Sequence, residues 1–217
     1  MSSIIYDYTE EYIKNLIPER SGTLKEMEDF AHQNHVPIVQ KDTAKFLEFM
    51  TSLKKPKKVL ELGTAIGFSS VLMYISSGTE PEIVTIERDP EMIELAKKNL
   101  SNLGLDKKIT IREGDCLEVL KTLEDSFDLI FVDAGKGHYN HFLPECLRLL
   151  ASDGIIIADN VLFRGMVATD ELVKRRKITI VKRMRNYLDL VNSSQDLITS
   201  VIPIGDGIAV TKRKDMF

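Results

Sequence analysis

Residues 58–70, KVLELGTAIGFSS, combine a short apolar strand, a turn with two glycines and the start of a helix. Residues 58–62 have the length and composition of a buried strand. Gly63 and Gly67 let the backbone turn tightly and approach a ligand closely, with a helix N-terminus directly behind the turn. Their spacing is not the G-x-G-x-x-G of a dinucleotide loop, which counts against NAD. The stretch predicts the first strand–helix unit of an α/β fold, with a ligand at its turn.

The same alternation of short strands and helices continues downstream to residue 159. Asp89 suits the N-cap of one of these helices, and Pro90 suits its first position. Five strand–helix alternations imply right-handed crossovers and a parallel sheet covered by helices on both faces. Further strands are expected at residues 82–87, 109–113, 129–133 and 154–159, and helices at residues 68–75, 89–103, 116–123 and 139–150.

Both ends of the chain depart from this alternation. Three helices are expected before the first strand, at residues 10–16, 23–35 and 43–53. A basic helix at residues 173–191 is followed by strands at 197–203 and 207–212, joined by a short turn that contains Gly205. Such a hairpin makes the last strand antiparallel to the others. We expect one domain, residues 1–217, in which a helical cap of residues 1–55 precedes a seven-stranded, mostly parallel core of residues 56–217.

The composition is that of an ordinary folded domain. The chain has 217 residues, 43% of them hydrophobic and 29% charged, which suits a single domain with one core. Its apolar runs are too short to span a membrane, and its first residues do not resemble a secretory signal. Cys116 and Cys146 lack metal-binding spacing, so we expect reduced thiols in a cytoplasmic protein without membrane contact.

Acidic residues stand at or just after the ends of four successive predicted strands: Glu61, Glu87, Asp115 and Asp133. Parallel sheets of this kind bind ligands beyond the carboxyl ends of their strands. A carboxylate at Glu87 can accept both hydrogen bonds of a ribose diol, and Asp115 can accept one from an adenine amino group. Asp115 by itself is equally well explained as a helix cap. The series of four is more specific than any one member.

Asp133 follows the fourth strand, and Asp159 and Asn160 follow the fifth. If these strands are neighbours, their ends lie about 5 Å apart, and three side-chain oxygens can share one ion. Two carboxylates and an amide form a hard ligand set that suits Mg²⁺ or a similar divalent cation. The alternative is an ordinary turn at Asp159-Asn160.

Six ordered motifs resemble the catechol and caffeoyl-CoA O-methyltransferase superfamily, over about residues 36 to 212: VLELGTAIGFSS, VTIERDP, GDCLEVL, DLIFVDAGKGHY, GIIIADNVLFRG and GDGIAVTKR. The resemblance implies the Rossmann-like class I methyltransferase fold and S-adenosylmethionine as donor. Val39 is implied to cover the methionine part, and Ala44 departs mildly from the glycine that the family often has there. The implied donor site comprises Val39, Glu61, Gly63, Ser69, Glu87, Asp115, Cys116 and Asp133.

The resemblance assigns metal binding to the same three residues, Asp133, Asp159 and Asn160. The expected catalytic residues are Asp133 and Lys136, because Lys136 matches the lysine that the family uses as general base. Two adjacent acceptor oxygens would chelate the ion, and one would attack the sulfonium methyl group in line. The alternative for Lys136 is a solvated surface lysine.

A basic window interrupts an acidic chain. The net charge is −4, yet residues 164–185 contain eight basic and two acidic residues. An amphipathic helix with a solvated basic face is one explanation, and contact with phosphates is the other. The candidate RNA-binding residues are Arg164, Lys174, Arg175, Arg176, Lys182 and Arg183.

Within the superfamily, the short N-terminus and the basic helix look most like bacterial tRNA 5-hydroxyuridine methyltransferases, which form 5-methoxyuridine at the wobble position. This resemblance implies tRNA rather than DNA as partner. Superfamily relatives are often homodimers, and we expect one here. Two alternatives stay open. One is a small-molecule catechol-type methyltransferase, which needs no basic surface, and the other is a non-catalytic nucleotide- or RNA-binding protein, which the presence of Lys136 and the metal ligands argues against.

Overall fold

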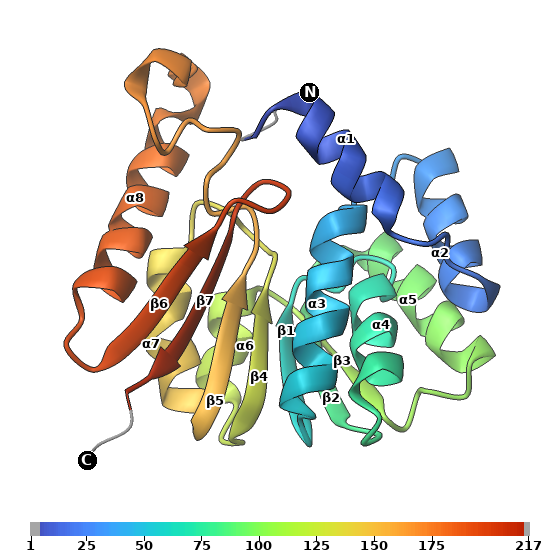
Figure 1. The fold of residues 1–217 in the computed structure, drawn as a ribbon. Coiled ribbons are helices and arrows are strands. Elements are labelled where there is room, and N and C mark those ends of the chain that lie inside the picture. Colours follow the sequence, from blue (N-terminus) through green and yellow to red (C-terminus); the bar gives the residue numbers. More distant parts are fainter. Residues whose placement is uncertain (1–4, 215–217) are drawn as a thin grey trace.

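A seven-stranded sheet divides the molecule into two helical layers (Figure 1). The computed structural model describes residues 5–214. The strand order is β3-β2-β1-β4-β5-β7-β6, in which β1 to β5 are parallel and β7 is antiparallel to both neighbours. This confirms the predicted sheet and its C-terminal hairpin. The strands are β1 Lys58–Leu62, β2 Glu82–Glu87, β3 Ile109–Glu113, β4 Phe127–Val132, β5 Leu150–Ala158, β6 Leu197–Ile202 and β7 Ile208–Arg213.

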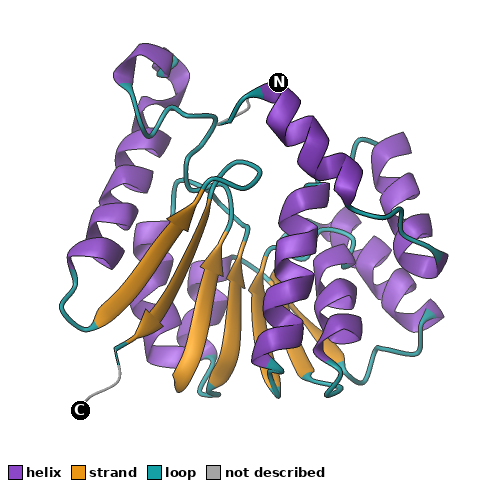
Figure 2. Ribbon diagram, viewed as in Figure 1, coloured by secondary structure: helices purple, strands orange, loops and turns teal. Residues whose placement is uncertain are grey.

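The helices cover both faces of the sheet, as the crossovers require (Figure 2). One hydrophobic cluster joins the sheet to α6, α7 and α8, and a second joins it to α2, α3, α4 and α5. The helix α1 contributes no buried residue. The helices are α1 Asp7–Leu16, α2 Gly22–Gln33, α3 Lys41–Lys54, α4 Phe68–Ser77, α5 Pro90–Asn102, α6 Cys116–Thr122, α7 Tyr139–Leu149 and α8 Ile178–Ser193.

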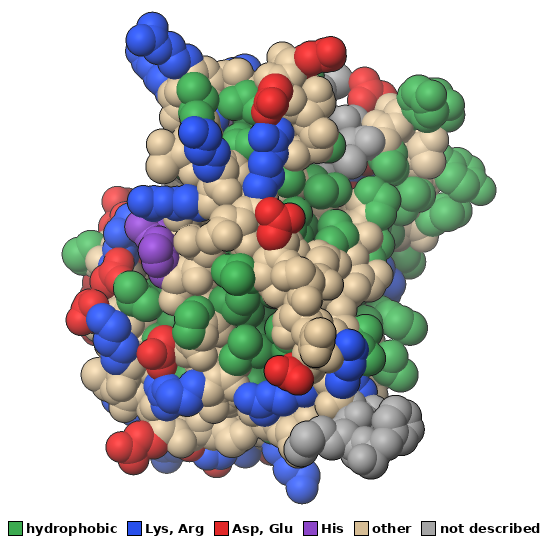
Figure 3. Space-filling view, turned by 90° about the vertical axis from the view of Figure 1, so that its left-hand side faces the viewer, with side chains coloured by type: hydrophobic (Ala, Val, Ile, Leu, Met, Phe, Trp, Pro, Cys, Tyr) green, Lys and Arg blue, Asp and Glu red, His purple; other side chains and the backbone are tan. Residues whose placement is uncertain are grey.

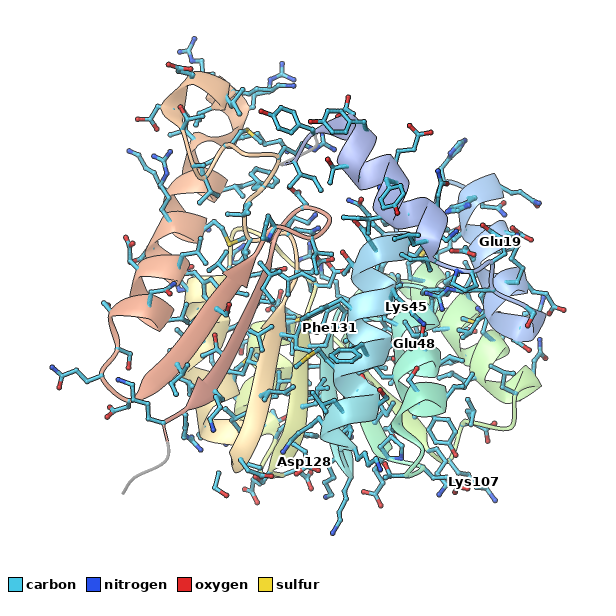
Figure 4. The ribbon with its side chains drawn as sticks, viewed as in Figure 1. Glu19, Lys45, Glu48, Lys107, Asp128 and Phe131 are labelled. Carbon is cyan, nitrogen blue, oxygen red and sulfur yellow. The ribbon has the colours of Figure 1, made fainter. Side chains whose placement is uncertain are left out.

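The central strands are apolar because both of their faces are buried. Along β4, Ile130 packs into the cluster with α6 to α8, whereas Leu129 and Phe131 pack into the opposite one. Phe131 is fully buried on the side of α3 (Figure 4). Truncating such a ring to alanine removes about 3–5 kcal/mol of stability. The centre of the sheet is therefore a rigid support for the loops that follow β4 and β5.

The predicted basic helix of residues 173–191 was placed too early. The α-helix starts at Ile178, and two short 3₁₀ turns, Asp170–Leu172 and Arg175–Lys177, precede it. Residues 174–177 are four consecutive cations, and the first turn of a helix disfavours cations because its free N–H groups carry partial positive charge. Residues 174–177 therefore lie before the helix. Across residues 5–214 we find no helical segment with the length and apolarity needed to cross a bilayer.

Candidate active site

A cavity of about 750 Å³ opens at the carboxyl ends of the parallel strands. The sequence predicts ligand binding at this edge of the sheet. Its walls include residues that the sequence assigned separately to donor, metal and catalysis. The predicted residues that line it are Val39, Gly63, Glu87, Asp115, Cys116, Asp133, Lys136, Asp159 and Asn160.

The turn after β1 requires its first glycine. Gly63 has a φ of +99°, and a Cβ there would lie 3.1 Å from the Cβ of Ala134. Its backbone N–H donates to the carbonyl of Ile86 at 3.0 Å, which ties the turn to the end of β2. The absence of a side chain therefore lets the turn close against the loop after β4 and leaves its backbone facing the cavity.

Glu87 is held in place by three backbone amides. One carboxylate oxygen accepts from Ala65 N at 2.9 Å, and the other accepts from Arg88 N at 2.8 Å and Asp89 N at 3.0 Å. A carboxylate has about four acceptor positions, so at least one remains for a ligand in the cavity. The geometry suits the predicted contact with a ribose diol.

Asp115 has the helix-cap role that the sequence offered, and its contact with adenine stays a prediction. Its side chain caps α6 by accepting from Leu117 N at 3.0 Å, and it also lines the cavity, with Arg88 3.6 Å away. The adjacent Cys116 is mostly buried, and burial, with a smaller contribution from the Asp115 charge, raises the pKa of its thiol to about 12. Cys116 is therefore an uncharged wall residue at neutral pH.

Glu61 and Ser69 do not line the cavity. Glu61 is fully buried behind the turn and accepts a hydrogen bond from the Thr85 hydroxyl at 2.6 Å and another from Ser70. Burial raises the pKa of Glu61 to about 7, although the hydroxyls of Ser69, Ser70 and Thr85 oppose this. The structure thus shows Glu61 bracing the turn from within. Direct contact of either residue with the donor stays a prediction.

The strand-tip cluster, defined as Asp133, Asp159 and Asn160, lies at the ends of two adjacent strands. Asp159 N donates to Val132 O at 3.0 Å, so β4 and β5 are still paired where the cluster begins. Asn160 has a φ of +57°, and its N–H donates to the Asp159 carboxylate at 2.6 Å. The Asp159 carboxylate thus accepts from the next amide along the chain, and the Val161 N–H donates to Gly207 O at 2.9 Å.

The cluster brings two carboxylates together in partly and fully buried positions. Burial raises the pKa of Asp133 to about 6, with Lys136 opposing the shift, and burial together with the Asp133 charge raises that of Asp159. A bound cation would relieve this repulsion and favour both carboxylates as anions. Residues 5–214 contain no group of three His, Cys, Asp or Glu with metal-binding geometry. A cation held at this cluster would need the Asn160 amide oxygen as its third ligand, and two carboxylates with an amide suit a hard divalent cation.

Lys136 lies on the loop between β4 and α7 and faces the same cavity. The loop turns at Gly135, whose carbonyl accepts from His138 N at 2.7 Å. Arg183 of α8 donates to the Gly137 carbonyl at 3.1 Å and so holds this loop, while its predicted contact with RNA stays a prediction. His138 and Phe142 also line the cavity, and the sequence did not predict this, although His138 directly follows the DAGKG motif and Phe142 lies one helical turn further on.

None of the six predicted RNA-binding residues lines the cavity. We call residues 164–177 the basic segment. Its five exposed cations make no ion pair within residues 5–214. They are Arg164, Lys174, Arg175, Arg176 and Lys177. The segment rises above the end of the sheet where the parallel strands finish (Figure 1), and basic side chains gather in that part of the surface (Figure 3). Lys182 is exposed on α8.

Comparisons with known proteins place the chain in a family. A family model described as O-methyltransferase matches residues 15–214. A catechol O-methyltransferase of Niastella koreensis is 31% identical, over 77% of this chain and 78% of its own. A caffeoyl-CoA O-methyltransferase of Medicago sativa is 26% identical, over 98% and 89% of the two chains. The chain belongs to the O-methyltransferase family.

Solved structures of similar fold support the same family assignment. A Staphylococcus aureus structure described as a candidate caffeoyl-CoA O-methyltransferase superposes with a TM-score of 0.87, at 30% identity over 96% of this chain and 100% of the other. A methyltransferase of Podospora anserina bound to SAH gives a TM-score of 0.88, at 26% identity over 99% and 100%. The predicted fold and the predicted O-methyltransferase of catechol or caffeoyl-CoA type are confirmed. The acceptor stays a prediction.

Proposed function

We propose that this enzyme transfers the methyl group of S-adenosylmethionine to one of two adjacent acceptor oxygens held by a divalent cation. The observation that carries the proposal is the strand-tip cluster, which shares one cavity with the Gly63 turn and Glu87. Family membership supports methyl transfer, and the Podospora anserina relative binds SAH, the product of that donor.

The donor side of the cavity matches the parts of S-adenosylmethionine. Glu87, oriented by its three backbone amides, accepts hydrogen bonds from the ribose diol. Asp115 and Cys116 lie beside the adenine, and Val39 covers the methionine part. Gly63 allows the ligand to approach the backbone closely. The bound donor supplies an electrophilic methyl group.

The acceptor side is formed by the strand-tip cluster and Lys136. Asp133, Asp159 and Asn160 would hold the divalent cation, which would orient two acceptor oxygens and lower the pKa of the acceptor hydroxyl. Lys136 Nζ takes the hydroxyl proton, the acceptor oxygen forms a bond to the methyl carbon, and the bond from that carbon to sulfur breaks. Positioning by the chain provides much of the acceleration.

Methyl transfer and its dependence on a cation are tested together. The purified protein is incubated with methyl-labelled S-adenosylmethionine and a simple catechol, with Mg²⁺ or with EDTA. We expect labelled product with Mg²⁺ and none with EDTA. Equal turnover in EDTA contradicts the role of the cation.

We further propose that the natural acceptor is 5-hydroxyuridine at the wobble position of tRNA. The 5-hydroxyl and the neighbouring 4-carbonyl oxygen present the same two-oxygen arrangement as a catechol. The basic segment supports this proposal, because its unpaired cations stand at the end of the molecule that contains the cavity. Arg164 follows the strand-tip cluster by only four positions.

A small-molecule acceptor is the second candidate, and the names of the catechol and caffeoyl-CoA relatives favour it. Labelled donor, Mg²⁺ and either undermodified tRNA or simple catechols separate the two. We expect label in tRNA, with inhibition that rises steeply with salt only for tRNA. Label that appears in catechols alone contradicts the tRNA acceptor and leaves the methyltransferase proposal intact.

A further inference from the structure

A single buried tyrosine lies between the two strand ends that carry the proposed metal ligands. Tyr139 is the first residue of α7 and is 1% exposed. Its hydroxyl oxygen lies 3.1 Å from the carbonyl oxygen of Val132 and 3.0 Å from that of Asp159. Val132 is the last residue of β4, and Asp159 follows the last residue of β5. The phenolic proton is therefore shared between the ends of neighbouring strands.

The position of this hydroxyl restrains the ligands themselves. Val132 O also accepts from Asp159 N at 3.0 Å, and its two lone pairs serve both donors. The Asp159 carbonyl belongs to the peptide that joins Asp159 to Asn160. Asn160 has a φ of +57°, a left-handed conformation that asparagine adopts more readily than most residues other than glycine. A hydrogen bond to that carbonyl opposes rotation of the peptide between two ligands.

The same contact closes the loop that carries Asp133 and Lys136. The loop leaves β4 at Val132 and enters α7 at Tyr139, whose hydroxyl returns to the Val132 carbonyl. Inside the loop, His138 N donates to Gly135 O at 2.7 Å. Both ends of the catalytic loop are therefore tied to one point of the backbone.

We propose that Tyr139 is a positioning residue whose hydroxyl clamps the ends of β4 and β5 and so sets the spacing of Asp133, Asp159 and Asn160 for metal binding. The inference rests on the proposed function, because it presumes the metal site. Tyr139 needs to contact neither donor nor acceptor for this role. It acts through the two carbonyls that it joins.

A neighbouring tyrosine provides the matched control. Tyr187 of α8 is 3% exposed and packs edge-on against Tyr139, with ring centroids 5.6 Å apart. Its hydroxyl makes no hydrogen bond to either strand end. Replacing either tyrosine by phenylalanine keeps a buried ring and removes one oxygen, and only Tyr139→Phe removes hydrogen bonds to the two strand ends.

Metal binding is measured on the protein alone, with Mn²⁺ as the probe and electron paramagnetic resonance of free Mn²⁺ as the readout. Partners that orient metal ligands commonly contribute 10- to 100-fold in affinity, so we expect Tyr139→Phe to bind Mn²⁺ about tenfold more weakly. We expect Tyr187→Phe to bind it as the wild type does. Equal affinity in Tyr139→Phe and the wild type overturns the clamp.

Amide hydrogen exchange gives a readout that needs no metal. Loss of the clamp should accelerate exchange of the Asp159 amide, which bonds to Val132 O, in Tyr139→Phe but not in Tyr187→Phe. Unchanged exchange in Tyr139→Phe overturns the clamp even if that variant binds Mn²⁺ poorly. If the wild type binds no Mn²⁺ while exchange responds as expected, the metal site of the proposed function fails and Tyr139 merely joins the strands.

Discussion

The strand-tip cluster and the basic segment are held in opposite ways. Asp159 is 2% exposed and Asn160 is 8% exposed. The Asp159 carboxylate accepts from the Asn160 N–H, and the Asp159 carbonyl accepts from the Tyr139 hydroxyl. The cluster is fixed by contacts within the fold, whereas the side chains of residues 174–177 are exposed and form no ion pair with the described residues.

This difference separates chemistry from recognition. A preorganised oxygen cluster suits a small cation and a reaction that needs precise placement. Exposed cations suit a polyanion, whose affinity comes from the sum of many loose contacts. Changes in the cluster should therefore affect every acceptor, and changes in the basic segment should affect tRNA alone.

The largest effect is expected from Asp159→Ala. Loss of a carboxylate ligand removes several kcal/mol of charge stabilisation, so kcat/KM should fall by about 10³-fold for any acceptor. Steady-state rates with saturating Mg²⁺ measure this. The control is Asp153→Ala, at the other end of β5, where an exposed carboxylate pairs with Lys54 at 2.7 Å and should contribute little. Full activity in Asp159→Ala contradicts the metal site.

Charge reversal of the basic segment comes next. The triple variant Lys174→Glu, Arg175→Glu, Arg176→Glu should lower kcat/KM for tRNA on the order of 30-fold at low salt and flatten its salt dependence. Catechol turnover should not change. The matched control reverses Lys55, Lys57 and Lys107, which are exposed at the opposite end of the sheet (Figure 4 labels Lys107). Equal losses in both triple variants would show a general charge effect.

Arg183 offers a finer separation, because it belongs to the predicted RNA-binding set yet donates to Gly137 O. Loss of one such hydrogen bond is worth about 1 kcal/mol, so Arg183→Gln should lower kcat about fivefold with either acceptor. Lys182→Gln, at the exposed neighbour, should affect only tRNA. A defect of Arg183→Gln that is confined to tRNA would indicate that Arg183 contacts RNA, and it would contradict the expected effect through the loop.

The smallest effect concerns the pH dependence of stability in metal-free protein. The pKa of Asp133 is about 6, against an ordinary value of 3.8, so the folded protein binds more protons than the unfolded chain between these values. The proton on Asp133 therefore stabilises the folded protein fully below the unfolded-state pKa of 3.8, and this stabilisation is lost as the pH rises through the folded-state pKa of about 6. Between pH 4.5 and 7 the Tm should lose about 5 °C relative to Asp133→Asn. Parallel Tm profiles for the two proteins would contradict it.

Much of the fold could be predicted because local and long-range signals agree. Residues 82–87 and 109–113 form strands with the expected bounds. Asp89 caps α5 by accepting from Glu91 N at 2.9 Å, and Pro90 opens that helix. These features depend on neighbours along the chain, which the sequence displays directly.

The features that the sequence did not predict depend on contacts between residues far apart in the chain. The start of α8 was misplaced because apolar spacing outweighed four adjacent cations. The sequence does not show that Glu61 accepts hydrogen bonds from Ser70 and Thr85, because these partners come from other elements; its contact with the donor stays a prediction. The hydrogen bonds of Tyr139 join α7 to the ends of β4 and β5, and no local sequence pattern predicts them.

Anomalous diffraction tests the central claim most directly. Crystals grown with S-adenosylhomocysteine and soaked in Mn²⁺ should show one anomalous peak bounded by oxygens of Asp133, Asp159 and Asn160, with the bound product against Glu87 in the same cavity. A peak elsewhere, or a cluster without metal at saturating Mn²⁺, would contradict the account.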